Sequence, residues 1–280
     1  MPRVITKQQI TPVTRKYVVD APLIARSAQP GQFVIVRVRE HGERIPLTIA
    51  DYDREAGTVT IVVQEVGATT HMLAGIPEGG EIQDMLGPLG EAANIPPSGH
   101  LVGVGGGYGA AALTCIMREA TRRGDKTTLI MGARTRDLLI LEDELRQACN
   151  NVKVCTDDGS KGFKGFVTER LAQLIEGQGP GKPEQVVAIG PMGMMRAVAE
   201  TTRPYGIPTH VSMDPVMVDG TGMCGGCRIT VGGEQRFACV DGPMFDGHLV
   251  DFDEAVRRRK MYEKEEALAV TCQRNPAGGA

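Results

Sequence analysis

The sequence contains no tryptophan, and aromatic residues make up only 4% of its 280 positions. It also lacks an apolar run that could span a bilayer, because glycines interrupt the longest one, residues 101–117. The N-terminal residues hold no apolar segment of the secretory type. A net charge of −3 provides no broad basic surface. We therefore expect a cytoplasmic protein without nucleic-acid or membrane partners.

No set of catalytic side chains stands out either. The five histidines are scattered, and neither a Ser–His–Asp arrangement nor a pair of carboxylates is evident. We therefore expect no catalytic residue in the narrow sense. Bound cofactors would then carry the chemistry.

Seven cysteines are an odd number for a chain without a secretory signal, which argues against a disulfide framework. Three of them cluster in the pattern Asp219-x4-Cys224-x2-Cys227-x11-Cys239. Plant-type [2Fe–2S] proteins use Cys-x4-Cys-x2-Cys and a distant cysteine, and here aspartate takes the first position. Four glycines lie between Asp219 and Cys227, as expected where backbone folds closely around inorganic sulfide. The pattern predicts a [2Fe–2S] cluster held by Asp219, Cys224, Cys227 and Cys239.

Other interpretations of this cluster stay open. A structural zinc site with one aspartate and three cysteines fits the Cys-x2-Cys pair, and the cysteines could also bind no metal. Asp214 or Cys272 could replace Asp219 as the fourth ligand. The remaining cysteines, Cys115, Cys149 and Cys155, are expected to be buried small hydrophobes or surface thiols.

The pattern of apolar residues changes twice along the chain. Short β-rich runs separated by turn residues fill roughly the first hundred positions, which predicts an antiparallel Greek-key β-barrel. Strands then alternate with helices, which is typical of a Rossmann-like parallel sheet. A glycine- and cysteine-rich region and a charged helix at about 253–270 follow. We expect domains at residues 1–97, 98–208 and 209–280, with a disordered tail from 275.

Two glycine-rich turns follow expected strands. Residues 105–110, Gly-Gly-Gly-Tyr-Gly-Ala, fit G-x-G-x-x-[GA] between a strand and a helix, where a pyrophosphate can bind. Gly190-Pro191-Met192 follows a later strand, and the carboxyl ends of parallel strands meet at one edge of a sheet. A tight strand–helix turn without a ligand is the other interpretation. The sequence thus favours a dinucleotide site at this edge.

The preference between NAD and NADP stays open. The second strand of this region ends in Gly132-Ala133-Arg134, without the acidic residue that holds a ribose diol. Arg134 and Arg136 could accept a 2′-phosphate, or they could be solvated loop residues. Asp157 and Asp158 could contact the nicotinamide ribose, or form a turn.

A β-barrel, a nicotinamide-binding domain and a C-terminal cysteine cluster together resemble the ferredoxin–NADP reductase superfamily. Within it, the chain is similar to the group that holds two electron-transfer subunits. One is that of class B dihydroorotate dehydrogenase. The other is the small subunit of NADH-dependent reduced ferredoxin:NADP oxidoreductase, also known as the sulfide dehydrogenase β subunit. The stretch from 217 to 253 carries this likeness most specifically.

The resemblance implies an FAD site on the barrel. Residues 44–48, Arg-Ile-Pro-Leu-Thr, resemble a motif whose arginine meets the flavin pyrophosphate and whose hydroxyl lies near flavin N5. Residues 66–70 resemble the following phosphate turn. The family spacing would put the arginine at position 45 rather than at Arg44. The implied FAD contacts are Arg44, Pro46, Leu47, Thr48, Val63, Gly67, Thr69 and Thr70. Those to NAD(H), with NADP as an alternative, are Gly105, Gly106, Gly107, Tyr108, Gly109, Arg134, Asp157, Asp158, Gly190, Pro191 and Met192.

The resemblance also implies a function and a partner. The chain would move electrons between NAD(H), FAD and the [2Fe–2S] cluster. It would work beside a larger subunit with its own flavin and iron–sulfur clusters, in a heterodimer that couples NADH, NADPH and ferredoxin by electron bifurcation. The dihydroorotate dehydrogenase subunit generally carries four cysteines, so Asp219 favours the oxidoreductase subunit. The alternatives are the dihydroorotate dehydrogenase B subunit and, in another class, a zinc-stabilised nucleotide-binding regulatory module.

Overall fold

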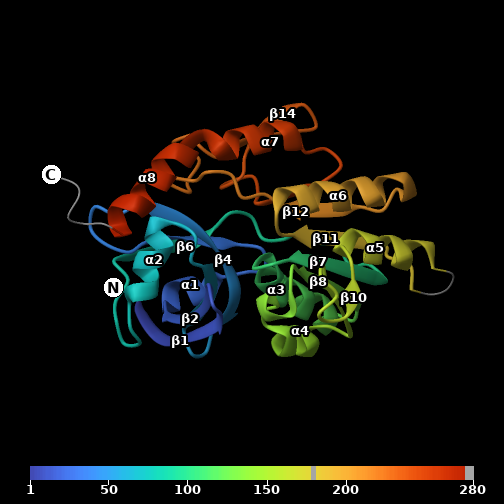
Figure 1. Cartoon of the computed structure of the whole chain (residues 1–280), viewed down its shortest axis with the longest axis horizontal. Coiled ribbons are helices and arrows are strands. Elements are labelled where there is room, and N and C mark those ends of the chain that lie inside the picture. Colours follow the sequence, from blue (N-terminus) through green and yellow to red (C-terminus); the bar gives the residue numbers. More distant parts are fainter. Residues whose placement is uncertain (178–180, 275–280) are drawn as a thin grey trace.

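The computed structural model describes residues 1–177 and 181–274 of the chain (Figure 1). Two sheets lie side by side, and a C-terminal helical segment runs from the second sheet across to the first (Figure 1). Among these described residues, no helix is both long and apolar enough to cross a membrane. The tail expected to be disordered from 275 lies outside the described residues.

The N-terminal sheet has six antiparallel strands in the order β1-β2-β5-β4-β3-β6. Their bounds are β1 Arg3–Thr11, β2 Thr14–Asp20, β3 Phe33–Arg37, β4 Arg44–Asp53, β5 Thr58–Gln64 and β6 Asp84–Leu89, with helices α1 Pro22–Ser27 and α2 Ala68–Gly75. Alternation drives the packing, since β5 buries Val59, Ile61 and Val63 and turns the residues between them outward. The expected antiparallel, barrel-like sheet is confirmed.

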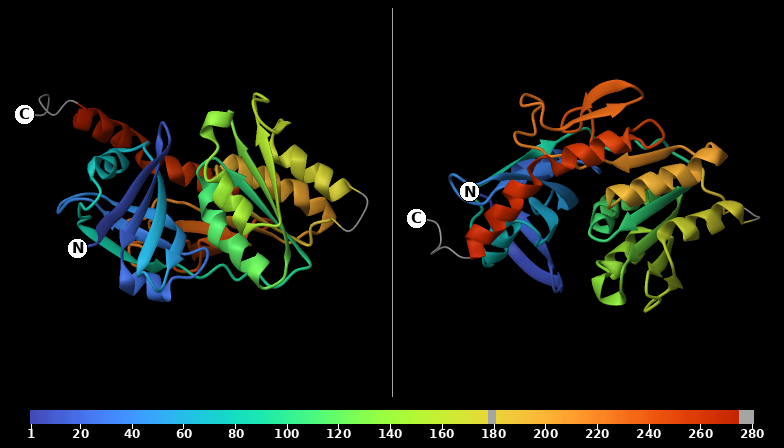
Figure 2. Two further views of the ribbon diagram at one scale, coloured as in Figure 1. Left: turned by 90° about the horizontal axis from the view of Figure 1, so that it is seen from below. Right: turned by 45° about the horizontal axis from the view of Figure 1, so that its top comes forward.

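The second sheet has seven strands in the order β10-β9-β8-β7-β11-β12-β15, all parallel except for β15 at the edge. Strand bounds are β7 His100–Gly106, β8 Lys126–Ala133, β9 Asn151–Thr156, β10 Phe163–Lys164, β11 Gln185–Ile189, β12 Thr209–Ser212 and β15 Met244–Asp246. Helix bounds are α3 Gly109–Arg122, η1 Arg136–Leu138, α4 Glu142–Ala148, α5 Val167–Glu176, α6 Met192–Thr202 and η2 Arg203–Tyr205. Helices α3 and α4 share one hydrophobic core with the sheet, and α5 and α6 another on its opposite face (Figure 2). The expected Rossmann-like domain is confirmed.

The C-terminal region departs from the sequence expectation in one respect. A hairpin of β13 Arg228–Val231 and β14 Glu234–Phe237 follows the cysteine-rich loop. The chain returns to the large sheet through β15 and then forms helices α7 Phe252–Arg259, η3 Lys260–Tyr262 and α8 Glu263–Arg274. The single helix expected at 253–270 is thus divided by the tighter turn η3. The domain limits at 97 and 208 stay a proposal.

Candidate functional site

A cavity of about 1240 Å³ is lined by residues of the barrel, of the nucleotide sheet and of the C-terminal segment. Its walls come from β4, the turn before α2, the loop between β7 and α3, the end of β11, the loop after β12, and α8. Of the residues expected to bind cofactors, Arg44, Pro46, Leu47, Thr48, Val63, Gly67, Thr69, Thr70, Tyr108, Gly109 and Gly190 line it. Gly105, Gly106, Gly107, Arg134, Asp157, Asp158, Pro191 and Met192 do not. The structure thus joins the expected flavin residues to part of the expected nucleotide turns.

Strand β4 supplies one wall of this cavity. Arg44 and Thr48 lie four residues apart and therefore share one face of the strand. Ile45 and Leu47, between them, pack against the barrel core. Arg44 thus lies on the same side of β4 as the Thr48 hydroxyl, although the family spacing would put the arginine at position 45.

The turn before α2 is held by Thr70. Its Oγ1 accepts hydrogen bonds from the backbone N–H groups of Val66 at 3.0 Å and Gly67 at 2.9 Å, and donates to the carbonyl of Gly67 at 2.9 Å. The hydroxyl of Thr69 donates to Glu43 at 2.5 Å. This turn is therefore preformed at the edge of the cavity, as a phosphate-binding turn requires.

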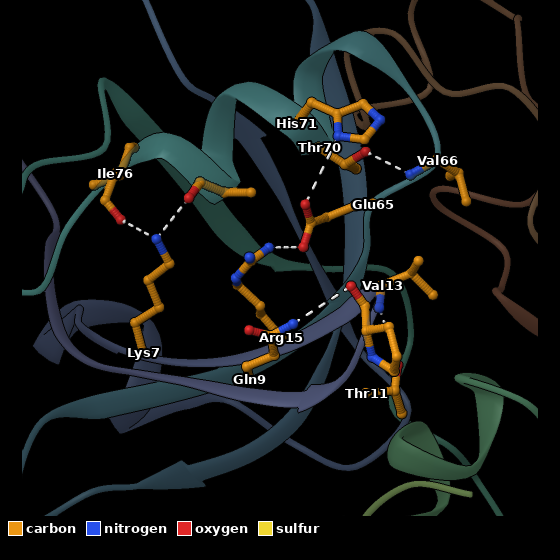
Figure 3. A network of polar contacts seen from close by, with 12 residues as sticks. Lys7, Gln9, Thr11, Val13, Arg15, Glu65, Val66, Thr70, His71 and Ile76 are labelled. Atoms are coloured by element: carbon orange, nitrogen blue, oxygen red, sulfur yellow. Dashed lines mark hydrogen bonds and ion pairs between the residues drawn. The ribbon is translucent and has the colours of Figure 1, made fainter. Parts of the chain in front are cut away.

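A network behind the turn holds α2 against the barrel (Figure 3). Glu65 forms an ion pair with Arg15, and the Nδ1 atom of His71 lies 3.7 Å from a carboxylate oxygen of Glu65. The side chains of Arg15 and Glu65 are only 20% and 15% exposed. Lys7 donates to the carbonyl oxygens of Ala74 at 2.6 Å and Ile76 at 2.9 Å at the end of α2. Both ends of the helix are thus anchored to strands β1, β2 and β5.

The glycine-rich turn after β7 packs directly against the end of β11. A Cβ at Gly109 would lie 2.5 Å from the carbonyl oxygen of Ile189, and one at Gly106 would lie 2.9 Å from the ring of Pro191. At Gly107 the requirement differs, because φ is +55° and a Cβ would meet nothing within 4 Å. These glycines bring the two expected nucleotide turns together at one edge of the sheet.

The candidate ribose-binding residues lie together at the ends of β8 and β9. The N–H of Asp157 donates to the carbonyl of Ala133 at 3.1 Å, and that of Asp158 to the carbonyl of Arg134 at 3.3 Å. Hydrogen bonds from Ser160 hold the pKa of Asp158 below its ordinary value. This loop is exposed, so Asp158 and Arg134 are accessible to a nucleotide.

Sequence reasoning missed a charged cluster inside the cavity. Asp214 follows β12 and pairs with Arg259 of α7, and Tyr108 lies beside this pair. Burial raises the pKa of Asp214, and the Arg259 guanidinium opposes this shift. The second carboxylate oxygen of Asp214 is buried and without a hydrogen-bond partner. Asp214 therefore lines the cavity wall, paired with an arginine.

The cysteine-rich loop continues from this wall. Val216, Met217 and Val218 line the cavity, and Asp219 follows them directly. Asp219 accepts hydrogen bonds from the backbone N–H groups of Thr221 and Cys224, each at 2.8 Å. The N–H of Thr221, as the main cause, lowers the pKa of this carboxyl. The loop is thus closed around an ionised aspartate.

The three cysteines of the loop differ in exposure. Cys227 and Cys239 are buried with their Sγ atoms 3.1 Å apart, while Cys224 is exposed and accepts a hydrogen bond from the N–H of Gly226 at 3.4 Å. Burial, and then the neighbouring Cys227 thiol, raise the pKa of Cys239 to about 12. Two thiols buried side by side ionise readily only beside a cation. This donor set fits an iron–sulfur cluster.

Glycines shape the cradle around these sulfur atoms. Gly220, Gly222 and Gly225 all have positive φ, and a Cβ at Gly222 would lie 2.5 Å from Val240. Within residues 1–177 and 181–274, no three His, Cys, Asp or Glu side chains converge closely enough for a single metal ion.

The other cysteines lie apart from this loop. Cys115, Cys149 and Cys155 are buried, and burial raises the pKa of Cys115 to about 11 and that of Cys149 to about 12. They are therefore protonated packing residues. Cys272 is exposed on α8.

Comparison with known proteins identifies two regions of the chain. Residues 214–251 match the iron–sulfur cluster binding domain of dihydroorotate dehydrogenase B, and residues 104–200 match an oxidoreductase NAD-binding domain. A Thermotoga maritima homologue of the dihydroorotate dehydrogenase B electron-transfer subunit is 42% identical over 95% of this chain and 93% of its own length. An uncharacterised Clostridium beijerinckii protein is 48% identical over 96% of this chain and 93% of its own.

Solved structures agree with these matches. The chain superposes on a protein described as NADH-dependent reduced ferredoxin–NADP oxidoreductase, in work on electron bifurcation, with a TM-score of 0.91, 40% identity and 97% coverage of both chains. Phthalate dioxygenase reductase, at 19% identity, a TM-score of 0.60 and coverage of 84% of this chain and 75% of its own, shares the fold. The expected superfamily and cofactor set are confirmed. The chain belongs to the family of dihydroorotate dehydrogenase B electron-transfer subunits and their homologues, oxidoreductases of the ferredoxin–NADP reductase type with FAD, NAD(H) and an iron–sulfur cluster.

Proposed function

We propose that this chain is the NAD(H)-side electron-transfer subunit of an NADH-dependent reduced ferredoxin:NADP oxidoreductase. One observation carries the proposal: the wall of the flavin cavity runs directly into the cysteine-rich loop, from Val216–Val218 to Asp219. The likeness to the oxidoreductase structure over 97% of both chains supports it. When consecutive stretches of backbone hold a flavin and a cluster, electrons can pass from the flavin to the cluster.

In this proposal the barrel residues bind and orient the flavin. Arg44 and the preformed turn at 66–70 hold the pyrophosphate, and the hydroxyl of Thr48 contacts the flavin near N5. Val63, Pro46 and Leu47 supply apolar walls. Bound FAD converts a hydride from NADH into single electrons.

The nucleotide residues hold the nicotinamide end. Gly190 and Tyr108 line the cavity where the two glycine-rich turns meet, so we place the nicotinamide there. Gly107 provides the open backbone at the start of α3 for the pyrophosphate. Arg134 and Asp158, at the exposed ends of β8 and β9, contact the adenosine end.

The cluster ligands in this proposal are Asp219, Cys224, Cys227 and Cys239. Support for Asp219 comes from its ionised carboxylate, which the loop backbone already holds beside Cys224. The other candidates for the fourth ligand are disfavoured, because Asp214 pairs with Arg259 and Cys272 lies on α8.

The chain's relatives are electron-transfer subunits, which work beside a catalytic subunit. We propose that the partner here is a larger subunit with its own flavin and iron–sulfur clusters, and that the heterodimer couples NADH, NADPH and ferredoxin in the cytoplasm. Affinity purification of the tagged chain from its native host, with identification of the subunit that accompanies it, tests this assignment.

A second candidate is the electron-transfer subunit of dihydroorotate dehydrogenase B, which the match at residues 214–251 favours. Co-purification with an FMN-binding dihydroorotate-oxidising subunit would select it. A zinc-stabilised regulatory module would instead yield a colourless protein that contains zinc.

The first experiment is a visible spectrum of the anaerobically purified chain, with iron, sulfide and zinc assayed on the same sample. We expect about one FAD, two irons and two sulfides per chain, and loss of visible absorbance on addition of NADH. Zinc without flavin would contradict the proposal.

A further inference from the structure

The helix α8 has little protein to pack against. Every side chain from Glu263 to Ala269 is exposed, and Val270 is half-buried. Isolated helices of about 12 residues are marginal in water, and most helical stability in proteins comes from packing of one face. Within the described part of the chain, α8 packs on α2 and η3. A further group must therefore pack against the inner face of α8.

The inner face of α8 is the roof of the flavin cavity. A broad face of α8 lines the cavity, namely Glu263, Glu265, Glu266, Ala267, Ala269 and Val270. Glu263, Glu266, Ala267 and Val270 form its centre at the i, i+3, i+4, i+7 spacing of one helix face. Leu268 lies on the other side, is 63% exposed and does not line the cavity. Figures 1 and 2 show α8 beside α2, above the barrel. The part of the cavity that α8 covers is thus expected to hold FAD.

The position of α8 indicates which part of FAD it faces. It packs on α2, whose first residues form the phosphate turn, whereas Tyr108 and Gly190 mark the nicotinamide end. Small side chains such as Ala267 allow a flat base to approach the helix. Carboxylates at this face can accept hydrogen bonds from ribose hydroxyls or an adenine amino group, whereas they would repel a pyrophosphate.

We propose that α8 is the outer wall of the FAD site, that it contacts the adenosine half of the cofactor, and that FAD in turn holds α8 in place. This inference rests on the assignment of the cavity to FAD. Helix α7, between the cluster loop and α8, is well anchored, since Arg258 donates to the carbonyl of Gly226 at 3.2 Å and Arg259 pairs with Asp214. The position of α8, which follows η3, depends on bound FAD.

Hydrogen exchange tests this dependence. Amides of residues 263–272 should exchange markedly more slowly in the FAD-loaded chain than after removal of FAD, while those of α7 should change little. Equal exchange of α8 in both states, in a chain that binds FAD, would overturn the inference and leave the proposed function intact. A native chain that binds no FAD would overturn both.

A pair of variants on the two faces of α8 provides the matched control. Val270→Glu places a charge under the roof, and Leu268→Glu places the same charge on the outer face. We expect the FAD dissociation constant to rise about tenfold or more in V270E, because the half-buried Val270 lines the cavity and a charge there replaces an apolar contact with the cofactor. It should change less than about twofold in L268E.

Removal of α8 gives an independent measurement. A chain that ends after Tyr262 should also bind FAD about tenfold or more weakly, with its iron content unchanged. Unchanged FAD affinity in both this chain and V270E would show that α8 is no part of the site. Loss of iron together with flavin would likewise contradict the separation of α8 from the cluster loop.

Discussion

Asp219 is the residue on which the cluster assignment depends most. Its two carboxylate oxygens already accept backbone hydrogen bonds within the loop. We expect Asp219→Asn to lower the iron content of the chain clearly, because the neutral amide is a poor iron ligand and keeps only one of the two acceptor oxygens. Asp219→Cys should retain about two irons with an altered visible spectrum.

Cys272→Ser is the control for this pair. Iron content should stay at the native level, because Cys272 lies on α8. Full iron in D219N combined with loss of iron in C272S would show that the fourth ligand comes from the C-terminal helix.

Two neighbouring glycines should respond differently to alanine. At Gly109 the new Cβ would lie 2.5 Å from a backbone carbonyl of β11, so the turn must move, which we expect to cost ~1–3 kcal/mol or more. At Gly107 there is open space and only the positive φ opposes the change, for ~1–2 kcal/mol. Urea unfolding should rank G109A below G107A, and the reverse order would contradict the packing described for this turn.

Two histidines, the buried His100 and the half-buried His210, make stability depend on pH. Burial lowers the pKa of His100 and of His210. His100 hydrogen-bonds Thr128 through Nε2 at 2.9 Å and the carbonyl of Lys182 through Nδ1 at 3.2 Å. The folded chain thus favours neutral rings, so their contribution is present above a pH of about 6.5 and is lost as pH falls below it.

Thermal unfolding at pH 7.5 and 5.5 measures this effect. His100→Gln should show a smaller drop between the two pH values than the native chain, because one titrating group has gone. An identical drop in the variant would exclude His100 as a contributor.

At the scale of elements, the junction of β5 and α2 depends on the hydroxyl of Thr70 (Figure 3). Thr70→Val keeps the shape but leaves the exposed N–H of Val66 and the part-buried N–H of Gly67 without their acceptor, at a cost of ~0.5–1.5 kcal/mol. We expect the FAD dissociation constant to rise about tenfold, as measured by flavin fluorescence. Thr70→Ser should restore affinity, and unchanged binding in T70V would mean that the turn does not need this hydroxyl.

The elements that sequence patterns could predict are those with a buried face. The strands near Phe33 and Val59 and the helix after Gly109 follow clear periodicities, and the structure contains them. β1 escapes this reasoning because it is a polar edge strand. The apolar residues from Leu138 onward would also suit a helix, but α4 begins only at Glu142, since Leu141 adopts a left-handed φ of 51° that sequence does not reveal.

At the scale of the whole molecule, the flavin cavity and the cysteine loop are distinct sites. Cys227 is buried with Cys239 and does not line the cavity. Cys227→Ser should therefore abolish reduction of the cluster while NADH still bleaches the flavin, as followed by rapid-mixing absorbance and electron paramagnetic resonance. Loss of flavin from C227S would show that the two sites fold as one.

Sequence motifs predicted the glycine turns and the cysteine loop because each is local. They could not predict the cluster of Asp214, Tyr108 and Arg259, whose members come from three separate segments. Nor could they place α8 over the barrel, since mixed charges at 257–266 are equally typical of a solvated helix. Only the packing of all three regions creates the cavity.

The cysteine loop and its hairpin are also an excursion from a single sheet. The chain leaves the sheet after β12 and returns in β15, which pairs antiparallel with β12 from His210↔Asp246 to Ser212↔Met244. Both ends of the excursion are therefore tied to each other by the same ladder of hydrogen bonds. A force on the loop therefore acts on this ladder, and the ladder fixes the position of the cysteine loop relative to the nucleotide sheet.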